Sequence, residues 1–571
     1  MQRKRISIKD DGDSEVIERL QEELGVSRVI ANLLSQRQIT NYKEAKDFFR
    51  PTLDMLHEPF LMKDMDKAVE RLNKAYAENE KILVYGDYDV DGTTSVALVF
   101  SYLRQYHPNL DFYIPNRYKE GYGISKQGID YAAENGCTLV IALDCGIKAV
   151  EQMEYAKTKS IDFVICDHHT PGETIPDATA VLDPKREDCN YPYKELSGCG
   201  VGFKFMQAFA QRNNLPFTAL TKFMDFLAVS IAADIVPITG ENRILAYYGL
   251  KQLNTEPNIG MKAILKVAHA VGRTLTITDC VFKIGPRINA AGRVRLADLA
   301  VNLLIETDPK QAKIKAQEIE QANKERRALD QEITNEAINI MGNSEPMKNK
   351  LSTVLYKSDW HKGVIGIVAS RLIETYYRPT IILTESNGFA TGSARSVKGF
   401  DLYAAINSCS HLLKNFGGHK YAAGLTMKIE NIEEFSECFE KYVSEHITEE
   451  QREPVVFVDT AIDFGEITPK FFRIMNQFAP FGPGNMTPVF LSHKVKNSGT
   501  TSTIGQSNAH LKLGMKNEAG VELPGIAFSM GDYYKEIVKR GTFDVCYSLD
   551  QNYFRGKVTL QAKVKYIDFN D

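Results

Sequence analysis

The stretch ILVYGDYDVDG at residues 82–92 decides the fold class, because it joins a short run of branched apolar residues to a cluster of three aspartates. Three later stretches repeat this pattern: TLVIAL before Asp144, FVIC before Asp167 and AVL before Asp183. Short apolar runs of this kind are typical of strands buried on both faces. The segments between them are long enough to hold helices. The sequence therefore predicts an α/β domain with a doubly wound parallel sheet.

The acids after these runs are expected to lie together, because functional groups of parallel sheets collect beyond the carboxyl ends of the strands. A further apolar stretch at residues 226–233 also runs into an acid, Asp234. The candidate catalytic and metal-binding residues are Asp87, Asp89, Asp91, Asp144, His168, His169 and Asp234. Like-charge repulsion disfavours such a cluster unless cations lie among the carboxylates. The sequence therefore predicts a metal centre.

The mixture of carboxylate and imidazole groups suits Mn²⁺ or Mg²⁺ better than Zn²⁺ or Ca²⁺. The cluster is rich enough for two ions, of which one helps generate hydroxide and the other stabilises the leaving oxygen of a phosphoester. The sequence has neither a Gly-x-Ser-x-Gly elbow nor the Gly-Lys-Ser/Thr of a P-loop, so the nucleophile is expected to be water. The residues alone thus predict metal-dependent phosphoester hydrolysis.

Other interpretations of the aspartates at 87, 89 and 91 are weaker. A calcium loop needs a glutamate at its end and flanking helices, and neither is expected here. Capping of the next helix accounts for one aspartate, but it does not explain acids after several separate strands. The glycine cluster GCGVG at 198–202 resembles a phosphate-binding turn, although a glycine cluster alone is poor evidence for one.

The bulk composition is that of an ordinary soluble protein, with 43% hydrophobic and 25% charged residues in a chain of 571. The chain contains no apolar run of about 18 residues, so no membrane span is expected. The first seven residues are not followed by the apolar core of a signal peptide. Nine scattered cysteines without a Cys-x-x-Cys pair favour a reducing cytoplasm and no zinc module. The net charge of −4 does not indicate nucleic-acid binding, but the aspartate cluster can offset basic residues elsewhere.

Several domains are expected along the chain. They are an N-terminal helical segment at 1–45, the catalytic domain at 46–305, a connecting helix at 306–345, a smaller α/β domain at 346–452 and a β-barrel at 453–571. The connecting helix should run from Asp308 to Met341 and would be roughly 50 Å long, enough to join two domains across a cleft. The alternative is a helix packed on one domain. Within the smaller domain, glycine-rich loops are expected at 391–395 and 416–420.

Four motifs, in order, resemble those of the DHH phosphoesterase superfamily: GDYDVDGTTS (86–95), DCG (144–146), DHH (167–169) and ADIVP (233–237). Motifs beyond these four narrow this resemblance to the bacterial single-strand-specific exonucleases of the superfamily. IGPRINAAGR (284–293) resembles their substrate loop, and WHKGVIGIVASR (360–371) with GGH (417–419) resembles their DHH-associated domain. PFGPGN (480–485) and the barrel after it resemble their OB-fold.

This resemblance implies processive 5′-to-3′ hydrolysis of single-stranded DNA to mononucleotides, with two Mn²⁺ or Mg²⁺ ions, during recombination and repair. It implies a metal shell of Asp87, Asp89, Asp91, Asp144, His168 and Asp234. His169 would be a ligand or a hydrogen-bond donor to the transition state, and these two roles stay open. Asp167 and Asp183 would contact the metal ligands rather than the metal, and Asp183 would orient a histidine.

The resemblance also implies a set of substrate contacts. Phosphate contacts from both sides of the cleft are expected of Arg287, Asn289, Arg293, Ser393, Arg395 and His419. Gly417 and Gly418 would let backbone amides approach a phosphate. Arg117 is a candidate 5′-phosphate clamp and Tyr122 a candidate base-stacking ring. For each arginine the alternative is a surface salt bridge, and for Tyr122 it is a packed ring.

Strand binding by the barrel is expected to use backbone charge and aromatic stacking, with Tyr553 and Phe554 as candidates unless they belong to its core. Single-strand binding protein and a recombination helicase are the implied protein partners. Because the chain ends soon after the barrel, an extra C-terminal partner-binding domain is not expected, which weakens the case for direct contact with the binding protein. Met486 replaces the proline of the family's Gly-Asn-Pro turn. Since that turn is far from the metal ligands in sequence, it is not expected to touch catalysis.

Two rival functions remain to be compared with the exonuclease. A phosphodiesterase for very short oligonucleotides or cyclic dinucleotides would carry the same motifs, but the barrel-like tail and the long helix favour a longer strand. A non-catalytic scaffold of the same fold should have lost motif acids, and here the acids are present.

Overall fold

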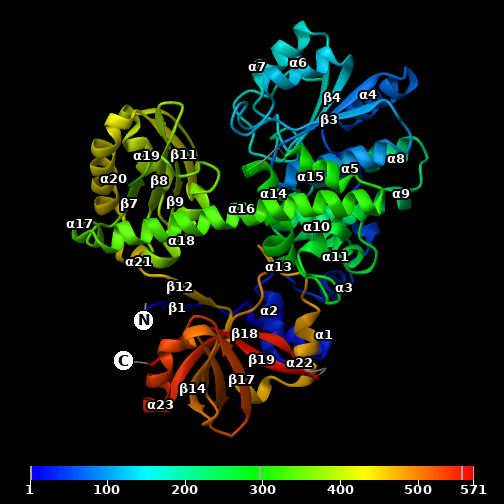
Figure 1. Cartoon of the computed structure of the whole chain (residues 1–571). Coiled ribbons are helices and arrows are strands. Elements are labelled where there is room, and N and C mark those ends of the chain that lie inside the picture. The colour runs from blue at the N-terminus through cyan, green and yellow to red at the C-terminus, as the bar shows by residue number, and fades with distance from the viewer. Residues whose placement is uncertain (1–2, 295–296, 555–556, 570–571) are drawn as a thin grey trace. The chain divides into compact units, whose positions relative to one another are not determined.

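The computed structural model describes residues 3–294, 297–554 and 557–569. The chain forms two compact units (Figure 1). One comprises residues 46–326 together with 478–486, and the other comprises 1–45, 327–477 and 487–571. Among the described helices, none combines the length and apolar character needed to cross a membrane.

The unit of residues 46–326 is built on a five-stranded sheet in which every pairing is parallel, as predicted. The strand order is β3 (Leu110–Tyr113), β2 (Lys81–Gly86), β4 (Cys137–Leu143), β5 (Asp162–Cys166), β6 (Ala180–Leu182). After β2 the chain first adds β3 on one side and then β4 on the other. The carboxyl ends of β2 and β4 therefore meet at a topological switch point, where binding sites of such sheets form.

Alternation along the strands sends side chains into two separate cores, one on each face of this sheet. Ile82 and Val84 of β2 join the core that contains helices α5 (Val90–Leu103), α8 (Gly198–Arg212) and α10 (Met224–Ala233). Leu83 and Tyr85 join the opposite core, with helices α6 (Lys126–Glu134) and α7 (Val150–Thr158). The apolar stretch before Asp234 is helix α10.

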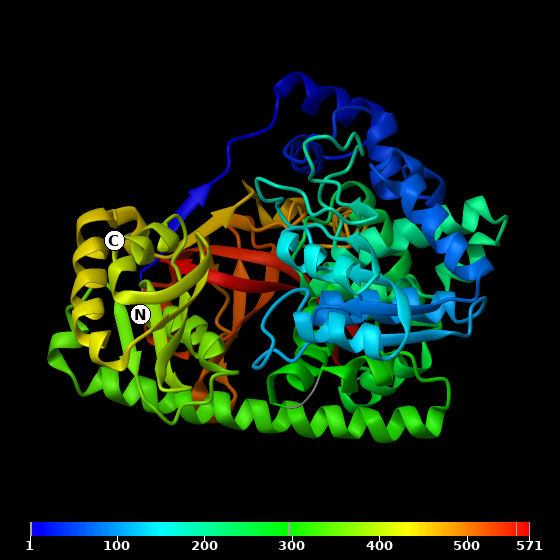
Figure 2. The same cartoon turned by 90° about the horizontal axis from the view of Figure 1, so that it is seen from above.

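Helix α16 (Pro309–Gly342) confirms the long helix and is continuous in both views (Figures 1 and 2). Its buried residues are divided between two cores. Ala312, Ala316 and Ile319 pack with the parallel-sheet unit. Ile333, Ala337 and Met341 pack with strand β7 (Thr353–Tyr356) and helix α18 (Ile365–Tyr376) of the other unit. The helix therefore contributes to both cores, which excludes the alternative of packing on one domain only.

A second sheet, of mixed direction, follows this helix. Its order is β10 (Leu413–His419), β11 (Ala422–Met427), β9 (Phe389–Arg395), β8 (Thr380–Ser386), β7 (Thr353–Tyr356). Helix α18 (Ile365–Tyr376) shares a core with residues of β7 and β8, while α19 (Leu402–Ser408) and α20 (Ile432–His446) share the core of the other face. The two glycine-rich stretches were expected to be loops, but they belong to strands β9 and β10. Both strands pair with β11 through backbone hydrogen bonds, which do not depend on side-chain size.

The C-terminal sheet has the order β13 (Thr460–Ala461), β14 (Phe490–Asn497), β18 (Thr542–Phe554), β19 (Lys557–Asp568), β17 (Glu522–Ala527), β16 (His510–Lys516), β15 (Ser502–Ile504). An additional pairing of β14 with β16 links five of these strands into a closed ring of pairings. The segment 455–458 lies outside this sheet as β12 (Val455–Val458) and pairs with β1 (Arg5–Ile8). The N-terminal segment is therefore not wholly helical: strand β1 precedes helices α1 (Ser14–Leu24), α2 (Arg28–Ser35) and α3 (Tyr42–Phe49).

Candidate metal centre

The turn from β2 into α5 places the first three aspartates in different local structures. Asp87 directly follows the strand, Asp89 caps the helix by accepting a 3.0 Å hydrogen bond from the Gly92 amide, and Asp91 lies in the first helical turn. A Cβ at Gly92 would lie 2.3 Å from the Asp87 carbonyl oxygen, so this tight turn requires glycine. The three acids thus do not share one loop, and the capping expected of one of them belongs to Asp89.

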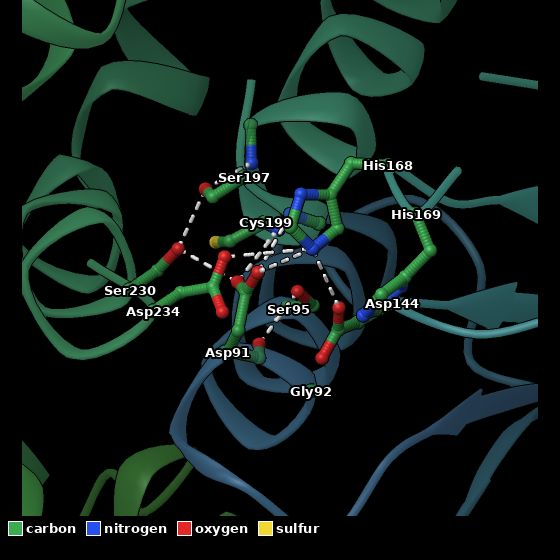
Figure 3. Close-up of polar contacts among 12 residues, drawn as sticks. Asp91, Gly92, Ser95, Asp144, His168, His169, Ser197, Cys199, Ser230 and Asp234 are labelled. Carbon is green, nitrogen blue, oxygen red and sulfur yellow. Dashed lines mark hydrogen bonds and ion pairs between the residues drawn. The ribbon is translucent and has the colours of Figure 1, made fainter. Parts of the chain in front are cut away.

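The Asp91 carboxylate is held by the start of helix α8 (Figure 3). Its Oδ2 accepts a 2.6 Å hydrogen bond from the Gly198 amide, and its Oδ1 accepts a 2.9 Å bond from the Cys199 amide. The Ser230 hydroxyl donates a third, of 2.7 Å, to Oδ1. Helix N-termini favour negative charge. The glycine cluster that resembles a phosphate-binding turn therefore binds the protein's own carboxylate.

His168 lies at the centre of three carboxylates (Figure 3). Its Nε2 is 3.2 Å from Asp144 Oδ1, 3.5 Å from Asp234 Oδ2 and 3.7 Å from Asp91 Oδ2. Burial lowers the pKa of His168, which favours the neutral imidazole that binds metals. Two groups of three residues have their ligand atoms within 4.8 Å of one another: Asp144, His168 and His169, and Asp91, His168 and Asp234.

The donor atoms of this centre fit divalent cations. Both carboxylate oxygens of Asp87, Oδ1 of Asp144 and both ring nitrogens of His168 are buried and have no hydrogen-bond partner among the described residues. Burial, followed by the charge of neighbouring aspartates, raises the pKa of Asp87 and Asp144, and it raises the pKa of Asp234 to about 8. Unpaired buried carboxylates are unfavourable unless a cation satisfies them.

His169 lies beside this group and is oriented by Asp167. Its Nδ1 is 2.7 Å from Asp167 Oδ1, and the Ile147 amide donates a 2.8 Å hydrogen bond to Asp167 Oδ2. Although burial opposes protonation, the hydrogen bond to Asp167 raises the pKa of His169 to about 9. The Tyr122 hydroxyl donates a 3.1 Å hydrogen bond to the Asp144 carbonyl and lies 3.2 Å from the His169 ring nitrogens. Tyr122 is 55% exposed as a residue, and its ring makes edge contacts with the rings of His169 and Tyr88.

Asp183 does not have the partner expected of it. Its Oδ1 accepts a 2.8 Å hydrogen bond from the Lys185 amide, and its Oδ2 has no hydrogen-bond partner among the described residues. Burial raises the pKa of Asp183 to about 7. Asp183 makes no hydrogen bond to a histidine among the described residues. Asp167, at the end of the neighbouring strand β5, makes such a contact with His169.

The expected substrate loop at 284–293 is helix α14 (Gly285–Val294). Arg287 on this helix is buried and its Nε lies 2.6 Å from Glu320 Oε2 of α16, which corresponds to the salt-bridge alternative. The Asn289 Oδ1 is buried without a hydrogen-bond partner among the described residues. The Arg293 carbonyl accepts a hydrogen bond from the Tyr118 hydroxyl.

Arg117 lies at a cavity close to the aspartates. Its guanidinium stacks over the Tyr88 ring at 4.0 Å from the centroid, and Tyr88 stands between Asp87 and Asp89 in the chain. The cavity measures about 470 Å³ and is lined by Arg117, Tyr88, Tyr118 and Gly292, among others. The structure therefore brings Arg117 and helix α14 to one side of the metal centre.

One face of the mixed sheet carries Ser393, Arg395, Gly417 and His419, and Gly418 belongs to the opposite face. The register aligns Gly417 with Gly424 and Gly424 with Ser393. Two residues further, it aligns His419 with Ala422 and Ala422 with Arg395 in the same way, so these side chains point to the same side of the sheet. Gly418 has a φ of +147°, and a Cβ there would lie 2.3 Å from the Ala422 carbonyl oxygen. The side chains of Tyr553 and Phe554 lie outside the described residues.

Three family models match successive parts of the chain. The N-terminal domain model of the DHH family matches residues 81–231, the DHHA1 domain matches 349–445, and the RecJ OB domain matches 458–566. The single-stranded-DNA-specific exonuclease RecJ of Bacillus subtilis is 35% identical over 97% of this chain and 69% of its own length. The protein of that name from Haemophilus influenzae is 34% identical over 95% and 96%, respectively.

The chain belongs to the RecJ family. Its structure is also similar to that of RecJ from Thermus thermophilus in complex with Mn²⁺, with a TM-score of 0.85, 25% identity, and coverage of 99% of this chain and 80% of that one. The Mg²⁺ complex of the same protein matches with a TM-score of 0.79. Family membership confirms the resemblance of all three domains, including the DHH and DHH-associated parts.

Sequence reasoning missed several residues that build the centre of this RecJ family member. Ser230 and Ser197 share a 2.7 Å hydrogen bond, and Ser197 caps α8. A Cβ at Gly198 would lie 2.6 Å from the Asp144 Cβ, so glycine is required where α8 meets β4. The only signal was the glycine cluster itself, which did not indicate which carboxylate its amides bind.

Proposed function

We propose that this chain is a metal-dependent exonuclease that degrades single-stranded DNA from its 5′ end to mononucleotides, in recombination and repair. The observation that carries this proposal is the set of buried donor atoms on Asp87, Asp144 and His168 that have no hydrogen-bond partner among the described residues. Relatives named single-stranded-DNA-specific exonucleases align with nearly the whole chain and support the choice of substrate.

Two divalent cations, Mn²⁺ or Mg²⁺, would be held by Asp87, Asp89, Asp91, Asp144, His168 and Asp234. When bound, such ions supply Lewis-acid stabilisation of the phosphoryl oxygens and lower the pKa of a water molecule. Contacts within the protein itself orient the carboxylates that would bind the cations. Two α8 amides and Ser230 orient Asp91, and the turn at Gly92 orients Asp87.

His169 is the chain's own proton-bearing group in this proposal. Because Asp167 Oδ1 lies 2.7 Å from its Nδ1 and fixes the ring orientation, His169 would donate a hydrogen bond to an oxygen of the scissile phosphate as negative charge develops there. Tyr122, tied to the Asp144 carbonyl through its hydroxyl, would present its exposed ring to the terminal base.

Two groups of residues are proposed to bind the phosphates of the DNA strand. Arg117 would bind the 5′-phosphate, with Asn289 and Arg293 as further contacts. Backbone phosphates further along the DNA would be bound by residues of strands β9 and β10 of the mixed sheet: Ser393, Arg395, Gly417, Gly418 and His419. Arg287 would have to break its ion pair with Glu320 before it could bind a phosphate. We therefore assign Arg287 the structural role of joining helix α14 to helix α16.

We also propose that the protein acts in the cytoplasm, supported by nine cysteines that are all free thiols. Single-strand binding protein and a recombination helicase are proposed as partners on the family resemblance alone. Co-sedimentation of the purified chain with each protein, in the absence of DNA, tests these two contacts.

The first experiment is Mn²⁺-dependent digestion of single-stranded DNA labelled separately at each end. Parallel reactions contain blunt duplex, RNA and a cyclic dinucleotide. Early release of a labelled mononucleotide from the 5′ end supports the proposal, provided that Asp144→Ala abolishes it and the exposed-site control Asp177→Asn does not. Cleavage of only short or cyclic substrates would instead establish the rival phosphodiesterase, and no cleavage with any metal would establish the scaffold.

A further inference from the structure

The segment Phe478–Met486 belongs to the same compact unit as the metal centre, although its neighbours in the chain do not. It leaves the other unit after helix α22 (Pro469–Asn476) and returns to it before strand β14. The RecJ OB domain model spans this segment in sequence. The expectation that this turn is unrelated to catalysis rested on its distance in sequence, which its position in the fold does not support.

Arg243 of helix α11 (Gly240–Thr255) holds the first part of the segment. Its guanidinium donates hydrogen bonds to the carbonyls of Phe478 at 2.9 Å, Ala479 at 3.1 Å and Pro480 at 3.3 Å. The Asn485 side chain, which is buried, donates to the Phe478 and Pro480 carbonyls at 2.8 and 2.9 Å. Buried backbone carbonyls satisfied in this way give the segment one defined shape.

The segment lies directly against the residues that follow Asp234. The Ile238 amide donates a 2.7 Å hydrogen bond to the Pro483 carbonyl. Gly484 has a φ of +73°, and a Cβ there would lie 2.8 Å from Cγ2 of Thr239. Asn242, the neighbour of Arg243, donates a 3.0 Å hydrogen bond to the Pro237 carbonyl. Adjacent residues of α11 therefore hold both sides of this contact.

The backbone between this contact and the metal centre is strained. Ile235 has a φ of +61° and is 66% exposed. A β-branched residue is rarely found in this conformation, which persists only where the surroundings enforce it. Asp234, the preceding residue, makes no side-chain hydrogen bond to another described residue. The printed contact of its carboxylate is with His168, whose Nε2 lies 3.5 Å from Asp234 Oδ2.

We propose that the segment 478–486 positions Asp234 in the metal centre. By fixing Pro237–Thr239, it enforces the strained backbone at Ile235 and so holds the Asp234 carboxylate 3.5 Å from His168 Nε2. This inference rests on the proposed role of Asp234 as a metal ligand. It makes a stretch of the OB domain sequence a part of the catalytic unit, with Gly484, Asn485 and Arg243 as positioning residues.

The test is Mn²⁺ binding, followed by titration calorimetry and by the electron paramagnetic resonance of free Mn²⁺, in the full-length chain. Gly484→Ala adds a methyl group that must displace Thr239. Gly272→Ala is the matched control, because Gly272 lies in the same unit with a φ of +85° and has no atom within 4 Å of an added Cβ. Both variants carry similar backbone strain. We expect Gly484→Ala to weaken Mn²⁺ binding roughly 10-fold or more and Gly272→Ala to leave it unchanged.

A rescue variant separates positioning from general destabilisation. Thr239→Ser removes the Cγ2 methyl that the new Cβ meets and keeps the hydroxyl that lies 3.1 Å from the Tyr193 hydroxyl. Combined with Gly484→Ala, it should restore Mn²⁺ affinity, while thermal stability stays lowered by the backbone strain. Equal affinities for Gly484→Ala and Gly272→Ala, or no rescue, would overturn the inference.

Asp234→Asn distinguishes failure of this inference from failure of the proposed function. If Asp234→Asn weakens Mn²⁺ binding and Gly484→Ala does not, the ligand assignment holds and the positioning role is refuted. If Asp234→Asn binds Mn²⁺ as well as the unaltered chain does, the ligand assignment itself is refuted, and the positioning role with it.

Discussion

The Ser230 hydroxyl donates a 2.7 Å hydrogen bond to Asp91 Oδ1, across 139 residues of chain. Ser230 lies on α10 and Asp91 on α5, so the bond joins two helices of one core at the metal centre. Asp91 Oδ1 also accepts the Cys199 amide of α8. Three helices therefore determine where one carboxylate points, which is the kind of support that precise metal ligands require.

Ser230→Ala should weaken both folding and metal binding. Loss of a buried hydrogen bond to a charged group costs about 1.5–3 kcal/mol of unfolding free energy, and the freed carboxylate should reduce Mn²⁺ affinity. The control is Ser492→Ala in the other unit, since Ser492 is also buried and makes two hydrogen bonds. Urea unfolding and Mn²⁺ titration of both variants check this. A loss of Mn²⁺ affinity in the control as large as that in Ser230→Ala would contradict it.

Asp144→Asn should stabilise the metal-free protein and abolish its response to Mn²⁺. The Asp144 carboxyl is buried among other acids, which raises its pKa, so the neutral amide should increase the unfolding free energy by roughly 1–3 kcal/mol. Asparagine also tolerates the φ of +59° at this position. The unaltered chain should gain about 2.7 kcal/mol at a hundredfold excess of Mn²⁺ over its dissociation constant.

Thermal unfolding with and without Mn²⁺ measures both effects of Asp144→Asn, and exposed-site Asp177→Asn serves as the control. A metal-free variant that is less stable than the unaltered chain would show that the cluster is not under repulsive strain.

Substitutions of Tyr122 should separate the role of its hydroxyl from that of its ring. Tyr122→Phe keeps the ring and loses the hydrogen bond to the Asp144 carbonyl, so we expect a lower kcat with little change in KM. Tyr122→Ala also removes a stacking surface that contributes about 1–3 kcal/mol per base, so KM should rise roughly 5- to 100-fold. Steady-state digestion of single-stranded DNA tests this, with Tyr76→Ala as a control at another half-exposed tyrosine. An unchanged KM in Tyr122→Ala would exclude stacking.

Glu306 should contribute to stability in a pH-dependent manner. The Asp308 amide, Lys315 and the Thr307 amide bind its carboxylate and lower its pKa to about 2. Because the folded-state pKa lies below the unfolded value of about 4.5, this contribution is complete above pH 4.5 and is lost as the pH falls towards 2. Glu306→Gln should therefore lower the unfolding midpoint at pH 6 and have little effect near pH 2.

Thermal unfolding across this pH range checks the Glu306 prediction. Glu345→Gln is the control, because its carboxylate is 80% exposed and forms an ion pair with Lys348, three residues further along the chain. A difference between Glu306→Gln and the unaltered chain that persists undiminished at pH 2 would refute the assigned pKa.

Local patterns in the sequence were sufficient for the regular elements with strong periodicity. The apolar runs at 82–85 and 163–166 predicted β2 and β5 correctly, because strands buried on both faces need continuous apolar residues. Caps and proline placement predicted helix α16 to within a residue at each end. The same rules gave no assignment for the apolar stretch at 226–233, which is helix α10, since a fully buried helix and a fully buried strand have similar composition.

For the metal centre, the sequence by itself determined which acids are candidates and that Asp87 and Asp144 follow the ends of strands. Only the tertiary structure decided that the amides of the 198–202 cluster bind Asp91 and that Asp167, rather than Asp183, orients a histidine. It also decided that the segment 478–486 packs beside the residues after Asp234. The physical reason is that side-chain periodicity reports which face of an element is buried, whereas contacts between distant segments depend on how those faces pack against one another.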